Sequence, residues 1–207
     1  MKEYRTAARQ ASDEFTEKKS RFIGSVKPVS NQAEAVAFIN EIRTKYWDAT
    51  HNVYAYVLRD GQIRRYSDDG EPQGTAGIPV LDVLLKEDVT DCAVVVTRYF
   101  GGIMLGAGGL VRAYSHASKM ALDAGGILTM APCTVCETQC DYNFYGKLSS
   151  LLQSAGACVI DSAFTENVKV MFSLETEKTD SFEALLTDSS KGGVFLEKLY
   201  EEYKNTR

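Results

Sequence analysis

"TRYFGGIMLGAGGLVRAY", residues Thr97–Tyr114, joins an apolar run to a segment with helical spacing. The run Ala93–Val96 is continuously apolar, which is typical of a strand covered on both of its faces. A loop follows, Gly101–Gly109, in which five of the nine residues are glycine. A helix is then predicted over residues 109–123, ended by Gly125 and Gly126. This stretch therefore predicts a buried strand that passes through a glycine loop into a helix.

On either side of this stretch, the first part of the chain reads as further strands and helices. Asn31 and Glu34 resemble a capping box at the start of a helix, and the Asp60-Gly61 pair predicts a hairpin turn. The predicted strands cover residues 22–29, 52–58, 62–66 and 92–99, and the other predicted helices cover residues 31–46 and 78–85.

The last part of the chain has a more regular pattern, which begins near Pro132. Strands are predicted over residues 134–141, from 158, over 168–174 and over 194–199, with helices starting at Asn143 and Asp180. The order is β-α-β-β-α-β, the ferredoxin-like arrangement. We therefore expect an α+β protein of two domains, residues 1–131 and residues 132–207.

Composition and charge limit the classes of function. Apolar residues make up 44% and charged residues 25%, as in ordinary globular proteins. The net charge of −5 belongs to residues 132–207, with 7 basic and 12 acidic residues, since residues 1–131 carry 16 of each. Nucleic-acid binding therefore needs a local basic patch in the first part. The absence of a long apolar run or signal-peptide pattern, with five cysteines, predicts a soluble cytoplasmic protein.

The glycine loop is the first candidate binding site. Glycine lets a ligand approach the backbone, and free N–H groups at a helix start attract anions. Arg98 before the loop and Arg112 after it would add charged contacts to a phosphate. The spacing matches no named nucleotide-binding motif, so the alternative is a close-packed strand-to-helix crossover. The glycines concerned are Gly101, Gly102, Gly106, Gly108 and Gly109.

The second candidate is the acidic turn in "RRYSDDGEPQGTAG", residues Arg64–Gly77. Asp68, Asp69 and Glu71 supply oxygens that suit Mg²⁺, general acid–base chemistry or contact with a partner. The alternative is a solvated turn, which this sequence also favours. We expect no bound metal here.

The histidines and cysteines give weaker signals. His51 and His116 lie in no recognisable nucleophile motif, so structural histidines are expected. Cys133 and Cys136 would point to opposite faces of a strand, and a tetrahedral zinc site also lacks a fourth ligand nearby. These cysteines, with Cys140, are interpreted as small apolar residues.

Four stretches together resemble the Impact (YigZ) family in its bacterial-length, two-domain form. They are "KKSRFIG" (Lys18–Gly24), "ATHNVYAYVL" (Ala49–Leu58), "RRYSDDGEPQGTAGIPVLDVL" (Arg64–Leu84) and "VVVTRYFGGIMLGAGGLVRAYSHAS" (Val94–Ser118). The resemblance implies an N-terminal domain of the ribosomal-protein and elongation-factor-G domain IV type, with a left-handed βαβ crossover. It also implies a small ferredoxin-like C-terminal domain.

The resemblance implies a role in translation. Eukaryotic members resemble regulators that compete for the activator of a starvation-responsive kinase, and they do so through an extra N-terminal domain. By analogy with ribosome-associated folds, we expect a non-enzymatic binding protein without a cofactor, whose partner is RNA, the ribosome or another polyanion. The alternatives are a Mg²⁺-dependent enzyme acting on a phosphorylated small molecule, and a protein-interaction module without a ligand.

The expected sites follow from these readings. The anion-facing set is Arg64, Arg65, Arg98, Tyr99, Gly101, Gly102, Gly106, Gly108, Gly109 and Arg112, and the partner- or substrate-facing set is His51, Asp68, Asp69, Glu71 and Thr75.

Overall fold

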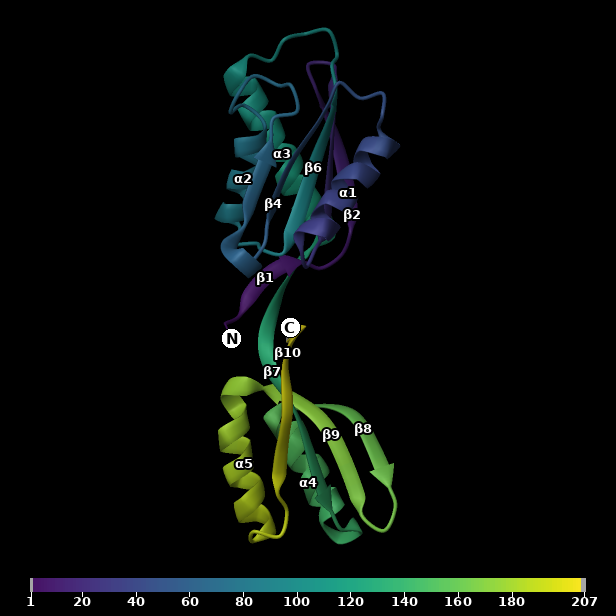
Figure 1. Cartoon of the computed structure of the whole chain (residues 1–207), viewed down its shortest axis with the longest axis vertical. Helices are drawn as coiled ribbons and strands as arrows, with labels where there is room; N and C mark the ends of the chain where they lie inside the picture. The colour runs from purple at the N-terminus through teal and green to yellow at the C-terminus, as the bar shows by residue number, and fades with distance from the viewer. Residues whose placement is uncertain (1, 206–207) are drawn as a thin grey trace. The chain divides into compact units, whose positions relative to one another are not determined.

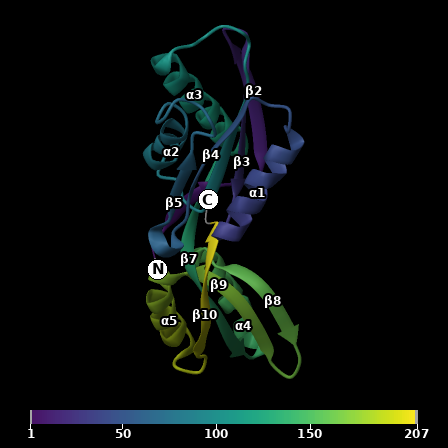
Figure 2. The same cartoon turned by 45° about the horizontal axis from the view of Figure 1, so that its top comes forward.

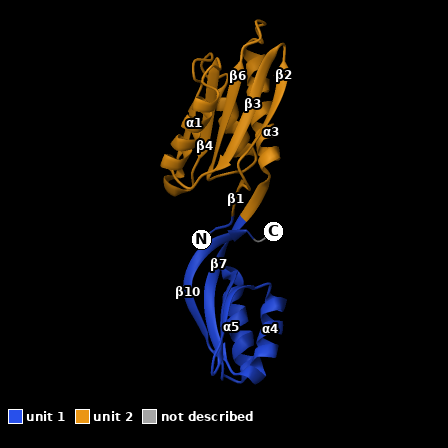
Figure 3. Ribbon diagram, turned by 90° about the vertical axis from the view of Figure 1, so that its right-hand side faces the viewer, with its two compact units in different colours: residues 1–3, 130–206 blue, residues 4–129, 207 orange. Residues whose placement is uncertain are grey.

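The computed structural model describes residues 2–205. Within that range the protein is mixed α/β, with five α-helices and two antiparallel sheets. It divides into two compact units, coloured separately in Figure 3. The larger unit comprises residues 4–129; the smaller unit comprises residues 130–205 together with residues 2–3. None of the helices within residues 2–205 is long and apolar enough to cross a membrane.

The larger unit is built around a sheet of order β2-β3-β6-β4-β5, in which every neighbouring pair is antiparallel. Figures 1 and 2 show these strands with their helices. The elements of the larger unit are β1 (Tyr4–Ala7), β2 (Ala11–Glu17), β3 (Ser20–Pro28), α1 (Gln32–Lys45), β4 (His51–Val57), a 3₁₀ turn (Asp60–Gln62), β5 (Arg64–Ser67), α2 (Gly77–Lys86), β6 (Cys92–Tyr99) and α3 (Ala107–Gly125).

Strand β6 is the centre of this sheet and is apolar on both faces. Ala93 and Val95 pack in the cluster that contains α1, whereas Val94 and Val96 pack in the cluster that contains α2 and α3. Helix α1 accordingly lies on one side of the sheet and α3 on the other, as Figure 3 shows. The prediction of a central strand covered on both faces is confirmed.

Two short sequence patterns in this unit set the start of a helix and the turn between two strands. Asn31 caps α1, because its side chain accepts a hydrogen bond from the Glu34 N–H at 2.9 Å. The Glu34 carboxylate accepts from the Ser30 N–H at 2.8 Å, one residue before the N-cap, so the first bond of the predicted capping box is formed and the reciprocal bond comes from Ser30 instead of Asn31. The Asp60-Gly61 turn joins β4 to β5, which pair antiparallel from Val57 and Arg64.

The smaller unit follows the order β-α-β-β-α-β. Its strands have the order β10-β7-β9-β8, with β1 also paired to β7, and α4 and α5 lie on one face of this sheet (Figure 3). Leu148 of α4, Phe182 of α5 and Phe172 of β9 belong to its apolar core. Its elements are β7 (Ile127–Cys140), α4 (Tyr142–Ala155), β8 (Cys158–Phe164), β9 (Val168–Glu175), α5 (Thr176–Ser190) and β10 (Leu196–Asn205).

Two helix starts in this unit differ from the predicted ones. Helix α4 is capped by Asp141, which accepts from the Phe144 N–H at 2.8 Å, and not by Asn143. Helix α5 begins at Thr176, so Asp180 lies inside it and pairs with Lys198 instead of capping. The cap of helix α4 therefore lies two residues before the predicted cap, at an earlier acceptor, and helix α5 starts four residues before the predicted cap.

Strand β7 also begins earlier than predicted and runs through Pro132. Proline cannot donate a ladder hydrogen bond, so it is excluded from most interior strand positions. Pairing of β7 with β9 starts only at Cys133, and Pro132 faces Tyr203 of β10 alone. Pro132 therefore costs β7 no bond to β9 and does not end the strand.

Candidate functional site

The glycine loop between β6 and α3 packs against the turn that joins β2 to β3. A Cβ on Gly101 would lie 2.0 Å from the carbonyl carbon and oxygen of Lys19, so only glycine fits at this position. The Gly101 N–H also donates to the Ser20 hydroxyl at 3.2 Å. This contact brings the exposed side chains of Lys18 and Lys19 next to the loop.

The glycine loop leads into helix α3, whose N-terminus has no side-chain cap. Gly106, with φ of 75°, is the N-cap of α3, and it supplies no side-chain acceptor. The first turn of α3 contains no acidic residue either. Gly108 is exposed at this helix start, and Gly109 is close to the Leu105 side chain. The helix itself therefore supplies no negative side chain to the positive end of its dipole.

A pocket of about 250 Å³ lies beside this helix start. Its walls come from the end of β2 and the turn after it, from the glycine loop and from the first turns of α3. Arg112 is on this wall, exposed, and makes no hydrogen bond or ion pair with another residue in the range 2–205. The lining residues are Phe15, Glu17, Lys18, Leu105, Gly109, Arg112, Ala113 and His116.

Arg98 lies beneath the loop and is not exposed. Its guanidinium donates to the Glu71 carboxylate at 2.5 Å, and the two side chains are 6% and 4% exposed. The guanidinium carbon also lies 5.4 Å from the ring centres of Phe22 and Phe100. The charge of Arg98 is thus already balanced inside the larger unit, so this arginine does not face an external anion in this structure.

Glu71 is the centre of a buried polar cluster. The same carboxylate oxygen that pairs with Arg98 accepts from the Tyr114 hydroxyl at 2.7 Å, and His51 Nε2 lies 3.8 Å from it. His51 Nδ1 donates to the Asp69 carbonyl at 2.8 Å. Burial raises the pKa of the Tyr114 phenol well above its ordinary value, and the negative charge of Glu71 raises it further. Tyr114 therefore remains a neutral donor to Glu71.

The two aspartates of the acidic turn are also engaged by the protein. Asp68 accepts three backbone N–H bonds, from Gly74, Ala76 and Gly77, at 2.8–3.1 Å. It therefore caps the start of α2, whose own N-cap residue has no side-chain cap. Asp69 accepts from Arg43 at 2.7 Å and from the Asn52 N–H at 2.6 Å.

The three carboxylates of this turn thus point toward three different sets of protein donors. Within residues 2–205, no three His, Cys, Asp or Glu side chains gather as a group suited to a metal ion. Thr75 is buried as well, and its hydroxyl donates to the Pro72 carbonyl at 2.6 Å. The acidic turn is thus organised to hold α2, β4 and α3 in place.

The remaining predicted residues lie in two places. Tyr99, half-buried at the end of β6, donates to Asp48 at 2.8 Å. Burial raises the pKa of the Tyr99 phenol, and the hydrogen bond to Asp48 adds to the rise. Arg64 and Arg65 are exposed on β5, at the sheet edge opposite to β2. Because Arg64 pairs with Val57, far along β4 from His51, the structure does not bring this pair to the glycine loop.

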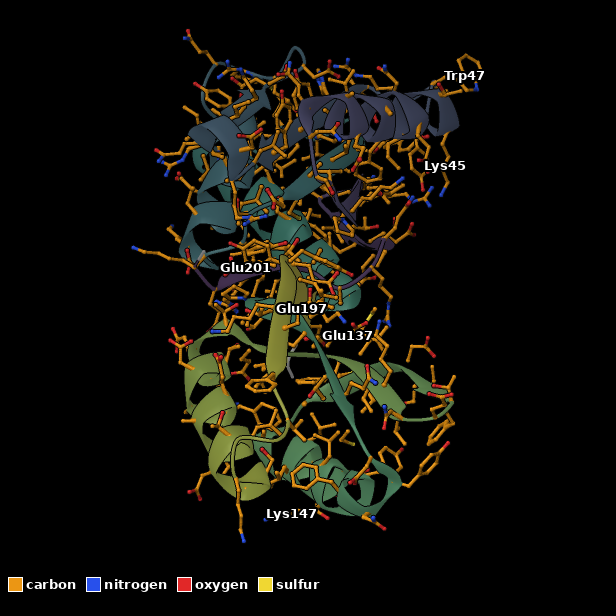
Figure 4. All side chains as sticks on the ribbon, turned by 60° about the horizontal axis from the view of Figure 1, so that its bottom comes forward. Lys45, Trp47, Glu137, Lys147, Glu197 and Glu201 are labelled. Atoms are coloured by element: carbon orange, nitrogen blue, oxygen red, sulfur yellow. The ribbon has the colours of Figure 1, made fainter. Side chains whose placement is uncertain are left out.

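Several residues around the loop were missed by the sequence reasoning. Tyr114 carries the hydrogen bond to Glu71, and its place on the buried side of the predicted helix was the available signal. Lys18 and Lys19 begin a distinctive stretch, but only the packing of Gly101 places them at the loop. Trp47 is 82% exposed just after α1 and projects into solvent in Figure 4, near the labelled Lys45.

Comparison with known proteins agrees on the two-part organisation. Residues 18–122 match the family model of the Impact N-terminal domain, and residues 138–192 match a domain of unknown function (DUF1949). The IMPACT family member YvyE of Bacillus subtilis is 37% identical over 212 residues, which cover 98% of each chain. The IMPACT family member YigZ of Escherichia coli is 37% identical over 182 residues, covering 86% of this chain and 89% of that protein.

A solved structure is similar over the same length. It is the crystal structure of a hypothetical protein, with a TM-score of 0.61 and 34% sequence identity. The match covers 97% of this chain and 98% of the other.

Proposed function

The chain belongs to the Impact family, and on that premise we propose that it is a cytoplasmic, translation-associated binding protein whose larger unit contacts RNA, the ribosome or another polyanion. The binding surface is the region around the glycine loop, made by Lys18, Lys19, Arg112 and the backbone at the start of α3. We further propose that the larger unit has the architecture of elongation-factor-G domain IV and that the smaller unit is ferredoxin-like. The sheet order β10-β7-β9-β8 supports the second assignment.

The observation that carries this proposal is a group of three positive side chains at one place that form no ion pair with any described residue, with Glu17 beside them. Lys18, Lys19 and Arg112 are exposed, and their charged groups have no hydrogen-bond or ion-pair partner within residues 2–205. They surround a helix start whose first turn has neither a side-chain cap nor an acidic residue. Cations and a free helix N-terminus favour phosphate groups, and neutralising phosphates supplies most of the affinity for nucleic acids.

Arg98 has a different part in this proposal from the one expected from the sequence. Its guanidinium is held by Glu71, and it also approaches the Ser20 hydroxyl at 3.4 Å, the group that accepts from Gly101. Arg98 therefore fixes the loop from below, and the ligand contacts belong to the exposed cations. Glu71, Asp68 and Asp69 likewise shape the surface without touching the ligand.

Exposed rings near the loop fit the same partner. Phe100 is 49% exposed, and its backbone N–H donates to the Thr50 hydroxyl, three residues after Trp47. Aromatic faces beside cations are the usual means by which proteins hold single-stranded nucleic acid, because every base offers a face for stacking. The excess charge of residues 132–207 is acidic; Glu137, Glu197 and Glu201 are labelled along β7 and β10 in Figure 4.

The test is RNA binding by the full-length protein at several salt concentrations. The triple variant Lys18→Ala/Lys19→Ala/Arg112→Ala should bind labelled RNA at least about tenfold more weakly. The slope of log affinity against log salt concentration should be smaller in magnitude by about 2, since each lost phosphate contact reduces the slope by about 0.7. The matched control is Arg64→Ala/Arg65→Ala/Lys86→Ala, which removes the same charge from other exposed positions.

Two outcomes contradict the proposal. One is the absence of RNA or ribosome binding even at low salt. The other is an equal loss of affinity in both triple variants, which would mean that net charge and not this surface controls binding. A rise in melting temperature that needs both a nucleotide and Mg²⁺ would instead favour an enzyme.

A further inference from the structure

We propose that the pocket beside α3 receives one unpaired nucleobase of the bound RNA, so that the larger unit selects single-stranded over double-stranded RNA. This inference rests on the proposed function, and it adds a site that the cationic surface alone does not require. It is carried by the size of the pocket, by its aromatic wall and by the unpaired charged groups at its rim.

The volume of the pocket suits a single base. Its volume is about 250 Å³. Pockets for complete small-molecule ligands usually enclose about 300–1,000 Å³, so a whole nucleotide with its phosphates exceeds this space. A single flat ring system fits, with its sugar and phosphate left outside at the rim.

One wall of the pocket is a fixed aromatic ring. Phe15 stacks on Phe22 with ring centres 5.2 Å apart and an angle of 12° between the planes. His116 meets the same Phe15 ring edge-on, at 4.7 Å and 72°. Since Phe22 is fully buried in the core, Phe15 is held in place before any ligand binds. Leu105 and Ala113 complete the apolar lining.

The rim carries both signs of charge in forms that a nucleotide uses. Lys18 and Arg112 lie at the pocket with no ion-pair partner in the described part of the chain, and they suit the flanking phosphates. Glu17 also lines the pocket, and its carboxylate is likewise unpaired within residues 2–205. A carboxylate accepts hydrogen bonds only, so it favours a base whose edge presents N–H donors. Guanine presents adjacent donors on one edge and is the base that this rim fits best.

A base can enter such a pocket only when it is unstacked and unpaired. In an RNA duplex the base edges are occupied by pairing, and the deep, narrow major groove keeps side chains away from them. Sequence-dependent recognition of RNA therefore acts mainly on single-stranded segments whose bases can turn outward onto aromatic side chains. The pocket thus predicts discrimination by strand state, and a purely electrostatic surface does not.

The experiment measures binding of labelled RNA octamers to the full-length protein by fluorescence anisotropy at fixed salt. The probes are octauridine, the same octamer with one central guanosine, and an RNA duplex of equal length. We expect the guanosine octamer to bind about tenfold more tightly than octauridine, the scale of one good base contact. The duplex should bind more weakly than either single strand.

Two variants test the pocket itself. Glu17→Gln should abolish most of the preference for guanosine; the ratio of the two affinities is the readout, because removing a negative charge raises the affinity for every RNA. Asp82→Asn, which removes an exposed carboxylate on α2, is the matched control and should keep the ratio. His116→Trp fills the exposed mouth of the pocket and should weaken the guanosine octamer down to the level of octauridine.

The outcomes separate this inference from the proposed function. Equal binding of all three probes, or a guanosine preference that both Glu17→Gln and His116→Trp retain, overturns the base pocket while polyanion binding stands. Failure of every probe to bind at low salt overturns the proposed function and the pocket together. Circular dichroism of each variant shows whether the fold is retained.

Discussion

Replacing Glu71 by glutamine tests the buried pair under the glycine loop most directly. Glutamine has the same shape and its carbonyl oxygen still accepts from Tyr114, so the change removes the negative charge alone. The Arg98 guanidinium, whose side chain is 6% exposed, keeps the carbonyl oxygen and Ser20 as acceptors, but its positive charge is then buried without a counter-ion. Breaking a buried ion pair on one side costs about 3–5 kcal/mol, because an uncompensated charge stays out of water.

Replacing Arg98 tests whether the loss of stability comes from the Arg98–Glu71 ion pair. Arg98→Met alone leaves the Glu71 carboxylate buried and should also lower the free energy of unfolding by about 3 kcal/mol or more. The double variant Glu71→Gln/Arg98→Met contains neither buried charge, so its loss should be well below the sum of the two single losses. We expect a coupling energy of about 2 kcal/mol or more between the two sites.

The assay is urea unfolding followed by circular dichroism, together with hydrogen exchange of the amides in β6. Because β6 is the central strand of the larger unit, its exchange reports the opening of that unit separately from the smaller one. A loss below about 1 kcal/mol for Glu71→Gln, or two single losses that simply add in the double variant, would show that Arg98 and Glu71 are not a coupled buried pair.

Three further predictions concern other contacts. Gly101→Ala should lower the free energy of unfolding by about 3 kcal/mol, because its Cβ would overlap the backbone of Lys19. Gly146→Ala, in α4 with open space around the new Cβ, should raise the free energy of unfolding by about 0.5–1 kcal/mol. Thermal unfolding of the two variants and the native chain measures both changes. Asp68→Ala should cost about 2 kcal/mol in urea unfolding and speed amide exchange in the first turn of α2, since three N–H groups lose their acceptor. Burial raises the pKa of the Cys92 thiol from 9.0 to about 12, so the thiol ionises first in the unfolded chain. The contribution of the neutral, buried Cys92 thiol to the free energy of unfolding is complete below about pH 9 and falls by about 1.4 kcal/mol per pH unit toward pH 12. Urea unfolding at several alkaline pH values should therefore show a shallower loss of stability for Cys92→Ala than for the native chain.

The elements that could be predicted from the sequence are those set by short-range signals. The apolar run of β6, the Asn31 cap and the Asp60-Gly61 turn each act within a few residues, and all three were located. Strand β2 was missed because Ala11–Glu17 lies at a sheet edge and is mostly exposed, so it has no clear alternation of apolar and polar residues.

The candidate site depended on contacts that no local pattern contains. Arg98 was expected to face an anion, since an arginine beside a glycine loop commonly does. Its partner, Glu71, is 27 positions earlier in the chain, and only the packing of β6 against the acidic turn brings the two together. Conversely, Lys18 was not among the expected site residues, and only the close approach of Gly101 to Lys19 places its turn beside the loop. Long-range pairing thus decided which charges were free.

The exposure of Trp47 has a practical consequence. It is the only tryptophan in the chain and is 82% exposed, so its indole is nearly as hydrated in the folded protein as in an unfolded one. Its emission should therefore change little when the protein unfolds. A molecule that covers the end of α1 would remove water from the indole and shift that emission. The protein thus carries its own optical reporter, one that is nearly silent to folding and responsive to an occupant at this end of the larger unit.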